Sequence, residues 1–274
     1  NSGSESVDSA MKIALAYHRA RGQAQRTRFV SREWAYHGVN FGGVALSGMM
    51  RNRQAFATGG LPHVSHMRHT WQEEQRYQLG EPAQGADLAS DLERIIATHG
   101  ADSIAACFVE PIAGSIGVYV PPAGYLKRLR DICDRHGILL VFDEVITGFG
   151  RTGEAFAAQS FTVKPDIITM AKALTNGAIP MGAVAVDESI YDAVVGASQG
   201  QGPELFHGYT YSGHPAACAA AVKHIEIFEE EGLVQQSAEK GVYLKKQLEE
   251  LRAPPTVGDD ELLTAIDRQC ASWA

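Results

Sequence analysis

The sequence predicts an α/β protein with a mostly parallel sheet and helices on both faces of that sheet. Three runs, "SIAACFVEPI", "ILLVFDEV" and "PDIITMAK", are almost continuously apolar, as strands buried on both faces are. These runs alternate along the chain with amphipathic segments that have the spacing of helices. Strands that alternate with helices in this way usually pair in parallel.

The first part of the chain is expected to form a helix, a strand and a glycine-rich loop. An amphipathic run over residues 7–19 predicts the helix, and the Ser-Gly-Ser-Glu-Ser cluster before it offers N-cap residues. Residues 26–32 alternate like a strand and lead into the loop "EWAYHGVNFGG". Residues 48–86 are rich in Gly, Pro, His and Gln, and we expect an irregular surface excursion there.

The remaining elements alternate more regularly. Helices are expected over residues 87–100, 121–137, 214–232 and 233–251. Strands are expected over residues 103–112, 138–145, 165–172 and 181–186. The second of these helices has Pro near its start and Gly at its end, which are the favoured positions of both residues.

Composition excludes several classes of function. The formal net charge is -8, and Lys and Arg are scattered, so we expect no nucleic-acid surface. No apolar run is long enough to cross a bilayer, and nothing resembles a signal peptide. The four cysteines lie far apart, which predicts free thiols in a reducing compartment rather than a disulfide frame or a metal site. We therefore expect a cytoplasmic protein without a membrane segment.

Three charged residues each end a different predicted strand: Glu110, Asp143 and Lys172. Taken singly, each is most simply an ordinary surface charge at a strand end. Ligands gather at the carboxyl ends of the strands in parallel sheets. Three such residues together, with glycine-rich loops after two of them, favour a ligand site.

Lys172 stands among apolar and small residues in "ITMAKALTNGAIPMGAV". It is either a surface lysine or a partly desolvated one, whose lowered pKa would make the amine a nucleophile towards carbonyl groups. Such a lysine can form a Schiff base. If its partner is pyridoxal phosphate, a buried carboxylate is needed to keep the pyridine nitrogen protonated. Asp143 is suited to that task.

The segment "NSGSES" could bind a phosphate, because a helix start offers free N–H groups, hydroxyls and the positive end of the helix dipole. The simpler interpretation is a structural N-cap. Tyr36, in the loop "YHGVNFGG", could lay its ring against the pyridine. Without the other residues it is better explained as a core or loop aromatic.

These motifs together resemble the class III, pyridoxal-phosphate-dependent aminotransferases of fold type I, most closely the omega-amino acid:pyruvate (beta-alanine–pyruvate) transaminases. The resemblance covers roughly residues 1–250 and keeps the family's order. It is carried by the segments "NSGSE", "YHG", "VEPIAGSIGVYVPPAGYL", "LLVFDEVITGFGRTG", "PDIITMAKALTNGAIPMGAV" and "ELFHGYTYSGHPAACAAA".

The resemblance implies a role for each matching residue. Lys172 would form the Schiff base with pyridoxal 5'-phosphate and carry the proton during transfer, while Asp143 would pair with the pyridine nitrogen. Val145 would pack against the ring face opposite Tyr36. Gly3 and Ser4 would hold the phosphate.

Four further residues receive roles by the same resemblance. Thr210 would contact the phosphate of the neighbouring subunit, which implies a homodimer. Glu110 would support the site near Asp143. His37 would lie behind the residues that touch the cofactor, and Glu144 would serve the structure through loop or partner hydrogen bonds.

The reaction that the resemblance implies moves an amino group from an amine donor, such as an omega-amino acid, to a keto acid acceptor, which is pyruvate in this subgroup. A 4-aminobutyrate, diamine or taurine aminotransferase is an alternative, because the distinguishing pocket residues have no match here. A second alternative is a catalytically incompetent relic that at most binds the cofactor. A Schiff-base aldolase would explain Lys172 but neither Asp143 nor the Thr210 segment.

The chain is shorter than the members of this family, and it looks truncated at both ends. We expect a large cofactor-binding domain over residues 1–222 without its first strand, then a linking helix and a remnant of the small domain over residues 223–274. The strand at 181–186 would then have an open edge. The tail from residue 251 onward does not fit the family's pattern, and no residue matches the family's arginine for the substrate carboxylate.

Overall fold

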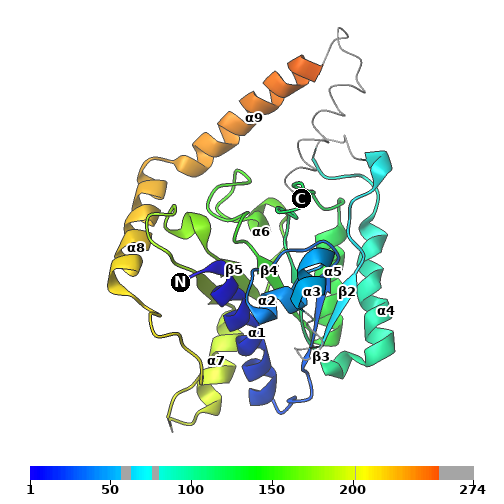
Figure 1. Cartoon of the computed structure of the whole chain (residues 1–274), viewed down its shortest axis with the longest axis vertical. Coiled ribbons are helices and arrows are strands. Elements are labelled where there is room, and N and C mark those ends of the chain that lie inside the picture. Colours follow the sequence, from blue (N-terminus) through cyan, green and yellow to red (C-terminus); the bar gives the residue numbers. More distant parts are fainter. Residues whose placement is uncertain (57–62, 76–79, 201, 253–274) are drawn as a thin grey trace.

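The computed structural model describes residues 1–56, 63–75, 80–200 and 202–252. Six strands form a single sheet in the order β2-β1-β3-β4-β5-β6 (Figure 1). The first five strands of this order are parallel, and β6 pairs antiparallel with β5, which confirms the predicted mostly parallel sheet. The strands are β1 (Arg28–Arg32), β2 (Val64–Met67), β3 (Ile104–Val109), β4 (Leu139–Asp143), β5 (Ile167–Met170) and β6 (Ala183–Val186).

Nine α-helices lie within the described residues. They are α1 (Gly3–Ala20), α2 (Phe41–Leu46), α3 (Met50–Phe56), α4 (Ser90–His99), α5 (Tyr125–His136), α6 (Ala157–Ser160), α7 (Glu188–Ala197), α8 (Pro215–Glu230) and α9 (Leu233–Arg252). Short 3-10 turns also occur at Glu73–Gln75, Ala86–Ala89, Ala101–Ser103 and Lys172–Leu174.

Helices cover both faces of the sheet, as predicted. One core cluster joins α4 and α5 to side chains such as Cys107 and Val109 of β3. The other joins α1 and α7 to the opposite face, including Phe108. Successive residues of a strand point to opposite faces, so every residue of β3 is buried. This explains why its sequence is continuously apolar.

The start of α1 confirms the predicted N-cap. Ser2 has extended backbone angles, and its Oγ accepts a hydrogen bond of 3.2 Å from the N–H of Glu5. The helix begins at Gly3, earlier than the predicted residue 7, because the Ser2 side chain already satisfies the first turn. The N-terminus of this 18-residue helix lies with the carboxyl ends of β3, β4 and β5 around one cavity.

The prediction of an irregular surface excursion over residues 48–86 is partly wrong. This segment contains α3 and the strand β2, which pairs with β1 in the register Phe29↔Val64. Such a short strand is stabilised by its non-local partner rather than by its own sequence. The helix α2 likewise begins inside the predicted glycine-rich loop, and α7 lies where no element was expected.

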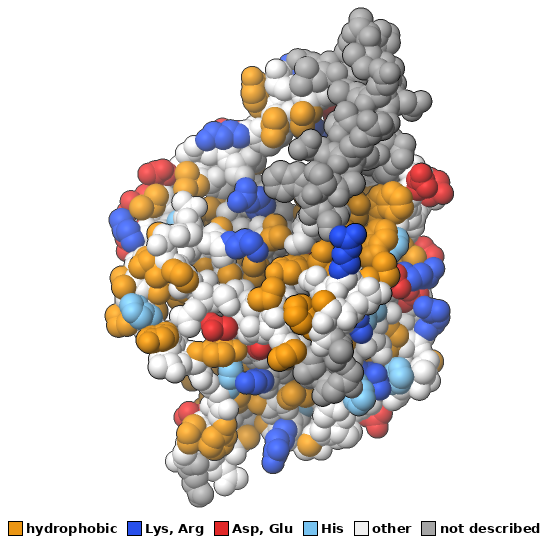
Figure 2. Space-filling model, viewed as in Figure 1, with side chains coloured by type: hydrophobic (Ala, Val, Ile, Leu, Met, Phe, Trp, Pro, Cys, Tyr) orange, Lys and Arg blue, Asp and Glu red, His pale blue; other side chains and the backbone are white. Residues whose placement is uncertain are grey.

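The surface agrees with the composition. Figure 2 shows Lys and Arg side chains scattered among apolar and acidic ones on the face that it displays. None of the helices within the described ranges combines the length and the apolar character that a bilayer crossing requires. Cys107, Cys133 and Cys218 are free thiols, as predicted, while Cys270 lies outside the described residues.

The helix α8 packs on the body of the molecule through the buried Ala217 and Ala221, whereas the C-terminal helix α9 leaves it. Figure 1 shows α9 extending away from the sheet and its covering helices. Several of its apolar side chains are exposed, including Tyr243 and Leu248. The strand β6 lies at one edge of the sheet, as expected for the 181–186 strand. The divergent tail lies outside the described residues from 253 onward.

Candidate active site

A cavity of about 330 Å³ lies at the carboxyl ends of β3, β4 and β5, beside the N-terminus of α1. Seven of the eight predicted site residues line it: Gly3, Ser4, Tyr36, Glu110, Asp143, Val145 and Lys172. They come from five separate parts of the chain. The topology, which aligns the ends of parallel strands at one rim, brings them together.

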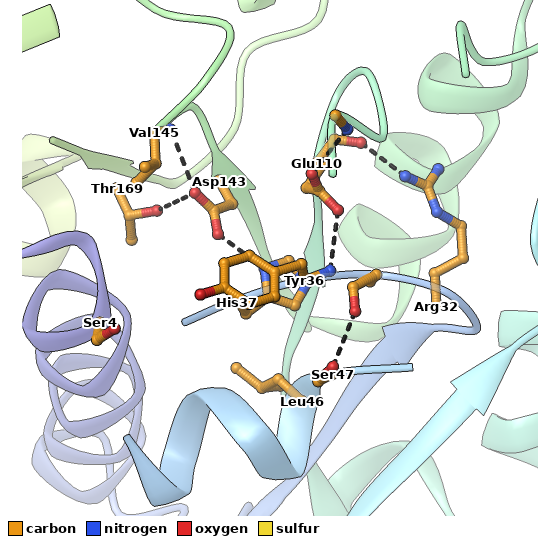
Figure 3. A network of polar contacts seen from close by, with 12 residues as sticks. Ser4, Arg32, Tyr36, His37, Leu46, Ser47, Glu110, Asp143, Val145 and Thr169 are labelled. Atoms are coloured by element: carbon orange, nitrogen blue, oxygen red, sulfur yellow. Dashed lines mark hydrogen bonds and ion pairs between the residues drawn. The ribbon is translucent and has the colours of Figure 1, made fainter. Parts of the chain in front are cut away.

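Asp143 ends β4 and is 5% exposed, so its charge needs partners. Its Oδ2 lies 2.8 Å from Nδ1 of His37 (Figure 3). Its Oδ1 accepts hydrogen bonds from Oγ1 of Thr169 at 3.1 Å and from the N–H of Val145 at 3.2 Å. Within the chain, His37 is therefore the group that meets this carboxylate. Its own Nε2 has no hydrogen-bond partner among the described residues.

Glu110 follows β3 and is also buried, at 4% exposure. Its carboxylate accepts the N–H of Tyr36 at 3.1 Å and the N–H of Gly114 at 2.9 Å. Burial raises the pKa of Glu110, and the nearby Asp143 adds to the rise while His37 opposes it. Because Glu110 binds the backbone of Tyr36, it fixes the loop that places Tyr36 and His37 at the cavity.

Glu144 lies next to Asp143 in the sequence but serves a different purpose. Its carboxylate accepts hydrogen bonds of 2.8 Å from Oγ1 of Thr147 and from the N–H groups of Ala157 and Ala158. Burial raises its pKa. The backbone donors belong to the first turn of α6, so Glu144 caps this helix. Its predicted structural role is confirmed.

The N-terminus of α1 packs tightly against two loops. Ser4 Oγ accepts the N–H of Val39 at 3.0 Å. A Cβ atom built on Gly3 would lie 3.1 Å from Cγ2 of Val145, and one on Gly38 would lie 2.6 Å from Ser4 Oγ. First-turn N–H groups have no acceptor within their helix. Those of Gly3 and Ser4 are therefore available at the cavity wall, which a larger side chain would obstruct.

Lys172 follows β5 and has a positive φ of 43°, in the left-handed region that non-glycine residues rarely adopt. Its side chain is exposed. Of the two interpretations of this lysine, its exposure in the single chain favours the surface one, and the partly desolvated one stays a prediction. The physical reason for this exposure is its position at the cavity rim, where Asn176, Gly177 and Ala178 beside it are exposed too.

Thr210 does not line this cavity, and it is exposed. Its neighbours Tyr209 and Tyr211 line a separate cavity of about 230 Å³ beside α1 and β6. A contact of Thr210 with a neighbouring subunit remains a prediction.

Some lining residues were not predicted: Ile146, Thr175, Ile179 and Met181. Thr169, which binds Asp143, was also missed. The sequence does contain a sign of this residue, because a lone threonine in the apolar strand "IITM" needs a buried hydrogen-bond partner. The residues at 175–181 carry no comparable signal, because only the return of the chain into β6 brings them to the cavity.

The fold and this cavity define an α/β protein with a ligand site at the carboxyl ends of its strands. More particularly, the chain belongs to the class-III aminotransferase family, whose model matches residues 1–260. It is 56% identical to an omega-aminotransferase of Caulobacter vibrioides, over 87% of this chain and 54% of that protein. It is 47% identical to a beta-alanine–pyruvate aminotransferase of Pseudomonas aeruginosa, over 94% of this chain and 58% of that protein.

The comparison with solved structures supports the same family. An amine transaminase from an uncultivated Pseudomonas species, in its PLP-bound form, matches with a TM-score of 0.81 and 41% identity, covering 92% of this chain and 56% of that one. The chain spans about half the length of the curated relatives it matches.

Proposed function

We propose that this chain is the cofactor-binding part of a pyridoxal-phosphate-dependent aminotransferase. The amino group would pass from an omega-amino acid or another amine to a keto acid such as pyruvate. The observation that carries the proposal is the arrangement of Lys172 and Asp143, which follow or end neighbouring strands and line the same cavity. The names of the similar omega- and beta-alanine–pyruvate aminotransferases support the choice of substrates.

The residues present fit pyridoxal 5'-phosphate. The cavity volume lies within the usual range of roughly 300–1,000 Å³ for small-molecule sites. It offers an amine at Lys172, a buried carboxylate at Asp143 and free N–H groups at the start of α1. The glycine at position 3 leaves open the space that a Cβ would fill.

Each part of this set would bind a different part of the cofactor. The N–H groups of Gly3 and Ser4 would hold the phosphate, with help from the dipole of α1. Asp143 would pair with the pyridine nitrogen, and Tyr36 and Val145 would enclose the ring. When bound, the cofactor supplies an electron sink for the carbon that loses its proton.

Lys172 would act at its Nζ atom. This amine would hold the cofactor covalently and would take a proton from the substrate carbon that bears the amino group. Its exposure at the rim leaves it free to swing between these two tasks. His37 and Thr169 would hold Asp143 in a fixed orientation, since both contact its oxygens.

We also infer a cytoplasmic homodimer. Thr210 is exposed and lies away from the cavity of its own chain, as a residue that serves a second subunit must. Free thiols support a reducing compartment.

Borohydride reduction tests the proposal. After incubation with pyridoxal phosphate and reduction, peptide mass spectrometry should find the added mass on Lys172, and the Lys172→Ala variant should lack it. Lys223→Ala, on the exposed surface of α8, is the matched control and should label like the original chain. Equal labelling of Lys172→Ala would reject the proposal. Pyruvate-dependent formation of alanine from beta-alanine then tests turnover, and binding without turnover would instead support the relic.

A further inference from the structure

Two side chains of the segment over residues 205–213, between α7 and α8, bond to α1: that of His207, and that of Tyr209 through a hydrogen bond with Ser9. Nε2 of His207 lies 2.8 Å from Oγ of Ser9, and its Nδ1 lies 3.2 Å from Nζ of Lys12. These partners are 198 and 195 positions away in the sequence. The contacts therefore join two parts of the fold that no secondary structure connects directly.

The partners determine the direction of every hydrogen bond. A lysine ammonium can only donate, so Nδ1 of His207 must be the acceptor. A neutral imidazole with an unprotonated Nδ1 carries its proton on Nε2, which then donates to Ser9 Oγ. The Ser9 hydroxyl in turn donates to the backbone oxygen of Glu5 at 2.7 Å. The whole chain of bonds requires His207 to be neutral.

Protonation of His207 would disrupt these hydrogen bonds. A proton on Nδ1 would remove the acceptor and place an imidazolium against the ammonium of Lys12. Asp8 of α1 also acts on His207 and would partly offset the repulsion. His207 also lines a groove between α1 and the chain that follows α7. The charged residues Arg19 of α1 and Glu204 line the same groove, and the residues that α7 contributes to it are uncharged.

The tethered segment carries Thr210. The ring of Tyr209 packs edge-on against His207, with ring centroids 5.1 Å apart. The N–H of Tyr209 donates to Ser212 Oγ, and the N–H of Ser212 donates to the oxygen of Tyr209, so the turn around Thr210 is closed. At its other end, α1 presents Gly3 and Ser4 to the cavity. His207 thus fixes the Thr210 turn relative to the helix that forms the cavity wall.

We propose that neutral His207 is a positioning residue, which holds the Thr210 turn against α1 and releases it when protonated. Any effect of His207 on catalysis rests on the proposed function, because Thr210 serves a cofactor site only if that function is correct. Burial, together with the charge of Lys12, lowers the pKa of His207 from its ordinary value of 6.5. The tether is accordingly intact at neutral pH and is lost in acid.

Imidazole NMR of the chain without cofactor tests the tautomer directly, with the His207 signal assigned by its loss in His207→Gln. We expect the Nε2–H tautomer at pH 7.5 and a titration midpoint below the ordinary histidine value of 6.5. An Nδ1–H tautomer, or a midpoint above 6.5, would overturn the proposal.

Amide hydrogen exchange tests the tether. His207→Leu should speed exchange at Tyr209 and Ser212 about tenfold at neutral pH, the effect of losing one to two hydrogen bonds. His207→Gln can still accept from Lys12 and donate to Ser9, so it should restore protection and remove its loss in acid. His99→Gln on α4 is the matched control. Unchanged exchange in His207→Leu would overturn the proposal. Both measurements omit the cofactor, so their failure is distinct from a failure of Lys172 labelling.

Discussion

Nδ1 of His37 lies 2.8 Å from Oδ2 of Asp143, and both side chains are almost completely buried. The other oxygen of Asp143 binds Thr169 and the backbone of Val145. The carboxylate at the end of β4 is thus held from both sides before any ligand is considered. Such an arrangement preorganises a charge for a binding partner.

Replacing His37 should therefore destabilise the fold. His37→Phe leaves Oδ2 of Asp143 buried without a donor, and we expect a loss of about 1–3 kcal/mol in the free energy of unfolding. Thr169→Val removes one donor from Oδ1, but the N–H of Val145 still donates to that oxygen. The loss in the free energy of unfolding should therefore be smaller. Urea denaturation of both variants measures the difference. A larger loss in Thr169→Val would contradict the central place of His37.

Glu110 should give stability a specific pH dependence. Because its pKa is raised above the ordinary value of 4.5, the folded protein binds this proton more tightly than the unfolded chain does. The contribution of Glu110 is fully present below pH 4.5 and is lost as the pH rises through the raised pKa. The stability advantage over Glu110→Gln, which cannot titrate, should shrink over this window. Urea denaturation at several pH values would refute this if the advantage grew with pH.

Gly38 should tolerate no side chain. It has a φ of 98°, and an added Cβ would lie 2.6 Å from Oγ and 2.8 Å from Cα of Ser4. We expect Gly38→Ala to cost about 2–5 kcal/mol, from backbone strain and overpacking together. Gly177→Ala is the matched control, because Gly177 has a φ of 74° but no atom within 4 Å of the added Cβ. It should cost only about 1 kcal/mol. Equal thermal unfolding of the two variants would show that the contact with Ser4 is unimportant.

The backbone at Lys172 should show strain. Glycine adopts a positive φ without a steric cost, whereas alanine does not. We expect Lys172→Gly to be more stable than Lys172→Ala by about 1 kcal/mol. Calorimetric unfolding of the two variants checks this, and neither contains the amine, so the comparison isolates the backbone. The reverse order would show that φ at this position relaxes freely.

The sequence was sufficient to predict the central sheet and most of the site, for a physical reason. Buried parallel strands such as β3 and β4 must be continuously apolar, so a charge at their ends is conspicuous. Glu110, Asp143 and Lys172 were found in this way. Their gathering then follows from the topology rather than from any local pattern.

Other features depend on contacts that a local pattern does not contain. The strand β2 is four residues long and partly exposed, and it forms because β1 lies beside it. The exposure of Lys172 could not be read from its apolar neighbours, since they pack beneath the rim. The role of Glu144 depends on the first turn of α6, 13 positions away. Such relationships are set by tertiary structure.

The reversed direction of β6 has a consequence for how this protein can be altered. A parallel neighbour would need a long crossover, but an antiparallel one needs only a short return. The 11 residues from 172 to 182 therefore form a short return beside the cavity, and Ile179, Pro180 and Met181 line it. Substitutions within this single return would reshape the cavity while the register of every strand stays as it is.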